Sequence, residues 1–172
     1  MKEIVGLADA ERVSPPNLES EWRPGANLEG HNLEGALLAG VHLSGANLRG
    51  ANLKNADLHG AFLDGADLRD ADCAGANLAL AVLGGAQLSG ARFTGANLRS
   101  ANLVGATGHN ADFSKADLYY SRPGNADLQG AVFRGANITR AIFRRANLRH
   151  ADFSGASGSA NFDRADLEGA KL

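Results

Sequence analysis

Apolar residues recur at every fifth position along most of the chain. From Ala26 onward the chain repeats the phrase Ala-Asn-Leu-Glu-Gly with almost no slippage. The middle residue of this phrase, called the centre, falls at positions 28, 33, 38 and so on to 153. Leu occupies 17 of these 26 centres and Phe another five, and Ala stands two residues before the centre in 23 of them. A phase held this long indicates a repeat architecture.

A period of five fits neither an α-helix nor a flat strand. On a helix, five steps rotate successive centres by about 140°, which scatters Leu around the whole cylinder. On a strand, an odd step sends alternate centres to opposite faces. Every centre points inward only if the chain turns once per repeat, so that four repeats close a square coil. We therefore predict stacked coils, about 4.8 Å apart, joined by backbone hydrogen bonds.

Columns of like residues at every fourth repeat support a coil with four sides. Cys73 is followed at this spacing by Phe93, Phe113, Phe133 and Phe153, whereas the next side carries mainly Leu. Gly at the end of the phrase supplies the conformational freedom that a corner requires. Asn or Asp before the centre bonds the local backbone of a turn.

Two segments and two centres depart from the repeat. Residues 1–25 precede it, and we interpret them as an N-terminal cap whose apolar spacing is typical of a short helix, with a disordered tail as the alternative. Residues 26–172 make a little over seven coils, in which the segment 156–159 is one residue short. Gly108 and Pro123 replace the apolar centre in a single coil. Gly108 lacks a side chain and Pro123 lacks an N–H, so we predict a dent with missing backbone bonds there.

The five-residue phrase resembles the signature of the pentapeptide-repeat protein family: Ala, then Asp or Asn, then Leu and two variable residues. It stands in this chain as ANLRG at residues 46–50 and as ADLRD at residues 66–70, and the resemblance extends from Ala26 over the rest of the chain. The resemblance implies an all-β fold, the right-handed quadrilateral β-helix, whose handedness comes from the family alone. Many members are cyanobacterial, and one subgroup protects DNA gyrase from quinolones by mimicking DNA.

The residues that carry chemistry argue against an enzyme. Cys73 occupies a centre, so we expect its thiol to be a buried packing group, and one Cys excludes a multi-thiolate metal site. The aspartates before the centres belong to the repeat, and a filled rod has no cleft for a substrate. We expect no catalytic residue, no cofactor and no metal. No apolar run spans a membrane and no secretory signal is visible, so we expect a cytoplasmic protein. The resemblance to a family with many cyanobacterial members implies a bacterial one.

Charge divides the chain into an acidic part and a basic part. Residues 1–75 carry a net charge of −6, residues 76–159 carry +5, and the last thirteen residues carry −1. A DNA mimic needs a continuous acidic surface, and the outward arginines of the basic part argue against one. A gyrase-binding DNA mimic is therefore the alternative interpretation and not the leading one. The basic part contains an arginine belt, which consists of Arg134, Arg140, Arg144, Arg145 and Arg149. Binding of nucleic acid by this belt is a second form of the alternative, but no aromatic residues stand beside the belt to stack on bases. The leading interpretation is a scaffold that binds a protein partner.

Outward apolar and aromatic residues mark two candidate interaction surfaces. The first is an apolar group on a wall that normally faces water. The second is the coil at residues 106–125, which combines Tyr and Arg, the residue types enriched at binding hot spots. The candidate residues of these surfaces and of the arginine belt are Leu37, Phe62, Leu80, Val82, His109, Tyr119, Tyr120, Arg122, Arg140, Arg144 and Arg145.

The C-terminal coil is the expected surface of self-association. The sequence stops at Leu172 in the middle of a repeat, without a counterpart to the cap. An uncapped coil presents unpaired backbone groups together with core Leu and Phe. Pairing of two such ends about a two-fold axis gives a closed homodimer, and the gyrase-protecting members of the family dimerise tail to tail. We therefore expect a homodimer joined at this end.

Overall fold

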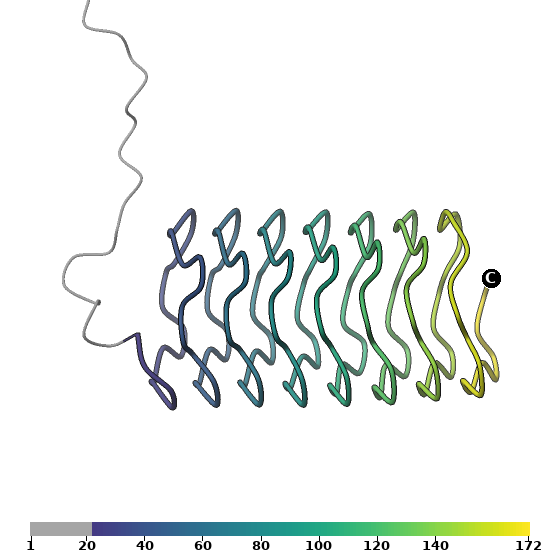
Figure 1. Cartoon of the computed structure of the whole chain (residues 1–172), viewed down its shortest axis with the longest axis horizontal. Helices are drawn as coiled ribbons and strands as arrows, with labels where there is room; N and C mark the ends of the chain where they lie inside the picture. The colour runs from purple at the N-terminus through teal and green to yellow at the C-terminus, as the bar shows by residue number, and fades with distance from the viewer. Residues whose placement is uncertain (1–21) are drawn as a thin grey trace, which may run out of the picture.

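The computed structural model describes residues 22–172, so most of the expected cap at residues 1–25 lies outside the described residues. The described chain winds into stacked coils that follow one another along a single axis (Figure 1). Trp22 precedes the first coil, and its half-buried side chain packs against the core. Parallel β-bridges, each one residue long, join the coils. Residues 22–172 contain no helix, and no strand in them is longer than such a bridge.

Successive coils pair at the spacing that the sequence predicts. Asn27 bridges Asn47, and one repeat later Asn32 bridges Asn52. Each bridge residue stands just before a centre, and its partner lies four repeats further along, which divides each coil into four walls. The bridge residues run from Asn27 to Asp166 on wall 1, from Asn32 to Lys171 on wall 2, from Leu37 to Ser157 on wall 3 and from His42 to Asn161 on wall 4.

The same pattern of backbone hydrogen bonds recurs from coil to coil. The N–H of Leu28 donates to the carbonyl of Asn47 at 2.7 Å, and the N–H of Asn47 donates back to the carbonyl of Ala26 at 2.8 Å. A turn ends each repeat, in which the N–H of His31 donates to the carbonyl of Leu28 at 3.1 Å. Gly30 within this turn has a φ of 65°. Gly adopts this left-handed conformation without a Cβ clash, which explains the Gly at the end of the phrase.

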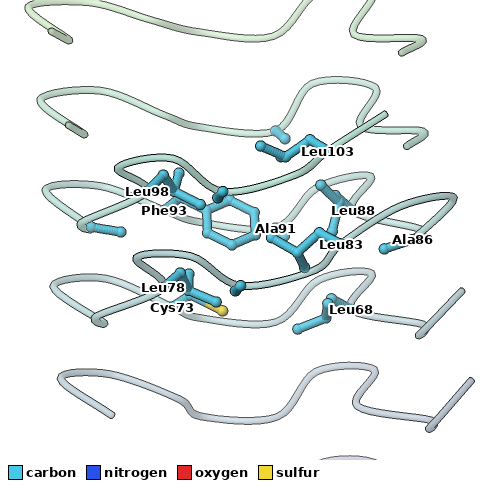
Figure 2. Packing of buried hydrophobic residues seen from close by; sticks show 14 of the residues in the cluster. Leu68, Cys73, Leu78, Leu83, Ala86, Leu88, Ala91, Phe93, Leu98 and Leu103 are labelled. Carbon is cyan, nitrogen blue, oxygen red and sulfur yellow. The ribbon is translucent and has the colours of Figure 1, made fainter. Parts of the chain in front are cut away.

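The centres and the Ala residues fill the interior as vertical columns. Figure 2 shows Cys73 below Phe93 and Leu68 below Leu88 in the next coil. The rings of Phe93 and Phe113 are parallel, with centroids 5.0 Å apart, close to the separation of the coils themselves. Cys73 is fully buried, and burial raises the pKa of its thiol, as expected of a packing group. The inward position of Ala and of the centre is thus confirmed.

The hole expected at Gly108 does not exist. The N–H of Gly108 donates to the carbonyl of Asp127 at 2.7 Å, so the ladder of wall 1 is unbroken at this point. The methyl carbon Cδ2 of Leu128 lies only 2.9 Å from the place that a Cβ on Gly108 would take. The prediction of a dent is therefore wrong at Gly108, because the Leu of the following coil fills the space.

At Pro123 the predicted break is confirmed. Pro123 has no N–H to donate to the carbonyl of Ile142, and the bridge between Arg122 and Ile142 is the single gap in the ladders of residues 22–172. The bonds beside the gap are stretched: Leu103 N–H to Arg122 O measures 3.1 Å, and Ala126 N–H to Pro123 O measures 3.4 Å. Wall 4 is therefore interrupted between these two coils.

One residue is missing from the repeat after Ser157, as the sequence predicts. Ile142 bridges Asn161, which is one residue nearer in the sequence than the partners of the earlier bridges. Gly158 absorbs the deletion with a φ of 87°, and a Cβ there would lie 2.8 Å from the Cα of Thr139. The ladders continue beyond this point to Lys171. The homodimer expected at this end stays a prediction.

Replacement of Phe113 by Ala is expected to lower the free energy of unfolding by about 3–5 kcal/mol. The neighbouring coils are held apart by their backbone ladders and cannot close the void. The exposed Gln129 provides the control, because Gln129→Ala should change stability by less than about 0.5 kcal/mol. Urea denaturation followed by circular dichroism measures both values. Equal losses at the two positions would contradict the assignment of inward and outward positions.

Replacement of Ser121 by Ala is expected to stabilise the chain by about 1 kcal/mol. Ser121 occupies an inward position that is otherwise almost always Ala, and its fully buried hydroxyl has no hydrogen-bond partner among the described residues. The reciprocal change Ala101→Ser, in the same column one coil earlier, should destabilise by a similar amount. The same denaturation experiment measures both, and a loss of stability in Ser121→Ala would show that the hydroxyl is satisfied.

Candidate interaction wall

Exposed apolar side chains gather on one wall of the rod. Seven large hydrophobic side chains are exposed in residues 22–172, and five of them lie on wall 4 or at the corner where wall 3 leads into it. Single exposed apolar residues are ordinary on any protein, but their concentration on one face is typical of a contact surface. The five are Phe62, Val104 and Ile142 on wall 4 and Leu80 and Tyr120 at the corner.

The first coils of wall 4 carry an apolar stripe made of His42, Phe62 and Val82. Phe62 bridges both of the other two residues, so the three side chains stand in successive coils on the same line. The rings of His42 and Phe62 are stacked, with centroids 4.5 Å apart and an interplanar angle of 16°. The stripe thus combines a stacked pair of rings with Val82 on the same line of the wall.

Further along wall 4, a hollow of about 250 Å³ lies beside the gap at Pro123. Gly124 is buried there, whereas the residue at this position is half-buried or exposed in the other described coils of the wall. The rod is therefore not filled to its surface everywhere, contrary to the expectation that it has no recess. The residues that line the hollow are Val104, Arg122, Gly124, Asn125, Ile142, Arg144 and Arg145.

Positive charge and apolar surface meet in the hollow. Arg144 Nε lies 3.2 Å from Asp163 Oδ2, so one of the three arginines already holds a carboxylate. Arg122 and Arg145 form no ion pair within residues 22–172. Ile142 contributes an exposed apolar side chain beside them. The arrangement suits an anionic group that is attached to an apolar stem.

Aromatic and cationic side chains are stacked on one another at the corner between walls 3 and 4. The guanidinium of Arg140 lies 5.1 Å from the centre of the Tyr120 ring and donates a hydrogen bond to the Tyr120 hydroxyl. Tyr120 meets Tyr119 edge to face at 4.7 Å, and Arg99 covers the Tyr119 ring at 4.3 Å. Such cation–π contacts order the four side chains and border the apolar part of wall 4.

The structure brings most of the predicted surface residues together. Phe62, Val82, Arg122 and Arg144 lie on wall 4, Leu80, Tyr120 and Arg140 lie at the corner before it, and Arg145 lies at the corner after it. Tyr119 lies on wall 3 next to that corner. The two surfaces that the sequence suggested separately are therefore parts of one face.

Two predicted residues lie away from this face. Leu37 is on wall 3 in the first coil, and His109 is on wall 1, where its Nε2 lies 2.7 Å from Asp127 Oδ2. Sequence reasoning missed Val104 and Ile142, which flank the hollow. The sequence shows that Val104 and Ile142 point outward on wall 4. Their importance depends on the hollow beside Pro123, which the sequence does not show.

Several acidic groups on the other walls are paired with bases of the same chain. Asp67 receives two hydrogen bonds from the Arg69 guanidinium, which hold the pKa of the Asp67 carboxyl below its usual value. Asp72 lies between Lys54 at 3.3 Å and Arg92 at 3.2 Å. The acidic charge of these walls is therefore neutralised in part, and Glu29, Glu34, Asp57 and Asp112 form no ion pair within residues 22–172.

Neither a cluster of metal-binding side chains nor a membrane-spanning helix is found in residues 22–172. Residues 22–172 contain no group of three or more side chains that could hold a metal ion. This part of the chain contains no helix that is long and apolar enough to cross a bilayer. The buried thiol of Cys73 has no such group around it.

Solved structures of repeat proteins resemble this chain. A pentapeptide repeat protein from the thylakoid lumen of Arabidopsis thaliana is 36% identical, with a TM-score of 0.53 and 71% of each chain covered. HetL, a pentapeptide repeat protein involved in heterocyst differentiation regulation from the cyanobacterium Nostoc, is 30% identical, with a TM-score of 0.37 and coverage of 86% of this chain and 77% of HetL. The plasmid-mediated fluoroquinolone resistance protein QnrB1 is 19% identical, with a TM-score of 0.49 and coverage of 85% and 90%.

The family itself is identified by direct matches along the sequence. No curated protein matches the chain. The Arabidopsis relative comes from the thylakoid lumen, so the cytoplasmic location expected from the sequence stays a prediction. Eight copies of the family described as pentapeptide repeats match residues 25–55, 46–85, 86–121 and 124–157. The chain, whose coils pair at every fourth repeat over the same range, belongs to the pentapeptide-repeat family.

Proposed function

We propose that this chain is a non-enzymatic scaffold that binds a protein partner through wall 4. The observation that carries the proposal is the gathering of five of the seven exposed large hydrophobic side chains on this wall and its adjoining corner. The family that matches the chain is a structural repeat family. Apolar surface of this kind favours contact with another protein over contact with water.

The backbone ladder supports this function because it fixes the binding surface in advance. The residues of the stripe are held by bridges to the neighbouring coils, so their backbone conformation has little freedom to lose on binding. A surface that is ordered before it meets its partner avoids part of the entropic cost of association. Phe62, whose ring is already stacked on His42, is the natural anchor of the contact.

Mimicry of DNA, as in a gyrase-binding protein, is the alternative that the paired acids disfavour. Asp70 lies 3.6 Å from Arg49, and Asp67 and Asp72 are paired in the same way. The chain becomes basic after residue 75, where a mimic of phosphates needs further acids. The likeness to QnrB1 is at 19% identity and concerns the fold alone.

The replacement Phe62→Ser tests the proposed surface. We expect the full chain to retain specific proteins from a lysate of the organism that encodes it, and Phe62→Ser to reduce their recovery about tenfold. Loss of an exposed apolar anchor should weaken the complex without disturbing the interior. The control His59→Ser changes an exposed position of wall 3 in the same coil and should leave recovery unchanged. Quantitative mass spectrometry measures recovery, and circular dichroism checks the fold of each variant.

Equal recovery with Phe62→Ser and with the unaltered chain would contradict the assignment of wall 4. A gyrase supercoiling assay, with and without a quinolone, separates the alternative function. We expect the chain to leave supercoiling and quinolone inhibition unchanged. Protection of gyrase in this assay would favour the DNA mimic over the scaffold.

A further inference from the structure

We propose that the hollow beside Pro123 binds a carboxylate side chain of the partner protein, carried on an extended segment that also places an apolar side chain on the stripe of wall 4. The inference rests on the proposed function and adds the chemistry that the partner must present. Its evidence is the charge of the hollow, its apolar flanks and its distance from the stripe, and the backbone of the hollow supplies the variants that test it.

The arginines of the hollow define the charge of the ligand. Arg122 and Arg145 have no carboxylate partner within residues 22–172, although both line the recess. Arg144, on the same wall, shows the contact expected of them, because it holds Asp163 at 3.2 Å. A planar guanidinium donates two parallel hydrogen bonds to a carboxylate, which gives both affinity and orientation.

The apolar flanks of the hollow favour an acidic side chain over a nucleic acid. Val104 and Ile142 are each 38% exposed and lie on either side of the recess. They can cover the aliphatic stem of Glu or Asp when the carboxylate reaches the arginines. None of the residues that line the hollow is aromatic, so bases of a single strand would have no platform on which to stack.

The distance between the stripe and the hollow sets the spacing in the partner. Phe62 and Arg122 belong to one ladder and are separated by three coils, which is about 14 Å at about 4.8 Å per coil. An extended segment rises about 3.4 Å per residue, so it covers this distance in about four residues. Residues four apart on an extended chain share one face. The partner segment therefore carries an apolar residue and an acidic residue four positions apart.

Two residues beside the hollow have side chains at a corner whose backbone conformation favours Gly. The corner that follows wall 4 is Gly at residues 45, 65, 85 and 105, whereas Asn125 and Arg145 occupy it next to the hollow. Their φ values are 54° and 58°, in the left-handed region that Gly adopts at no steric cost. Other corners of residues 22–172 carry non-Gly residues with a similar φ, among them Ser100, Lys115 and Arg164, so this conformation alone does not mark a binding site. It makes Arg145→Gly a replacement that the backbone accepts.

The floor of the hollow supplies a matched pair of variants. Gly124 and Gly84 occupy the same position two coils apart on wall 4, and neither has a positive φ. A Cβ at Gly124 would lie 3.5 Å from Arg144 O, and a Cβ at Gly84 would lie 3.7 Å from Val104 O. Both distances are ordinary contacts, so Gly124→Ala and Gly84→Ala should fold equally well. Only the first raises the floor of the hollow.

The test is a selection of random nine-residue peptides, displayed on phage, against the immobilised full chain. We expect the selected peptides to share Asp or Glu four positions from an apolar residue. The dissociation constant of the strongest synthetic peptide, labelled with fluorescein, is then measured by fluorescence anisotropy. Replacement of its acidic residue by the corresponding amide should weaken binding about tenfold, and Gly124→Ala about fivefold, whereas Gly84→Ala should change it less than about twofold.

Arg145→Gly separates binding from folding. We expect this variant to weaken peptide binding about fivefold while its thermal unfolding temperature stays the same or rises, because Gly relieves the left-handed backbone. A role of Arg145 in stability alone would instead lower the unfolding temperature and leave binding intact. That result would overturn the proposal.

The remaining outcomes distinguish the hollow from the wall. Binding that is lost in Phe62→Ser but unchanged in Gly124→Ala and Arg145→Gly would overturn the carboxylate site and leave the scaffold function standing. Failure to select peptides, or peptides without acidic residues, would overturn the proposal as well. Tighter binding of a single-stranded or duplex oligonucleotide, with the same dependence on Arg145, would identify nucleic acid as the ligand and overturn the protein source.

Discussion

Backbone hydrogen bonds between successive coils hold every wall of this rod at one spacing. Each centre that has an N–H donates it to the following coil, so each core side chain stands over its counterpart four repeats away. Matching side chains pack best in such a column, which explains the stacked rings of Phe113 and Phe133 at 5.0 Å. The same register lets Asn47 donate its side-chain amide to Asn27 at 3.0 Å on the outer surface. The repetition of the sequence is thus the consequence of one geometric constraint.

The same constraint explains how a rod without a cleft acquires a recess. In a globular core, a missing contact is partly closed by movement of its neighbours. Here the coils on both sides of Pro123 are fixed by the intact ladders of walls 1, 2 and 3. The place of the missing bridge between Arg122 and Ile142 is therefore not closed by movement of the coils. Gly124, Arg144 and Arg145 line the hollow beside it. A local change in one residue is converted into a shaped surface because the surroundings do not relax.

The sequence predicted the structure best where the structure depends on the spacing of residues alone. The coil length, the inward columns and the shortened repeat at Gly158 follow from counting residues, because each wall repeats the same local geometry. The outcome at Gly108 was not predictable, since it depends on where the methyl groups of Leu128 lie in the next coil. Val104 and Ile142 escaped notice for a related reason, because they matter only once the recess at Pro123 exists. Handedness followed from the family resemblance and not from spacing.

Amide hydrogen exchange of the free chain, followed by NMR, tests most directly whether the missing bridge between Arg122 and Ile142 weakens the neighbouring backbone hydrogen bonds of wall 4. The N–H groups of Leu103 and Ala126 flank Pro123 and donate across 3.1 Å and 3.4 Å, whereas their equivalents in the preceding coil, Leu83 and Ala106, donate across 2.7 Å and 3.1 Å. Our account predicts that Leu103 and Ala126 exchange about tenfold faster than Leu83 and Ala106. Equal protection of the two pairs would show that wall 4 is continuous and would contradict the account.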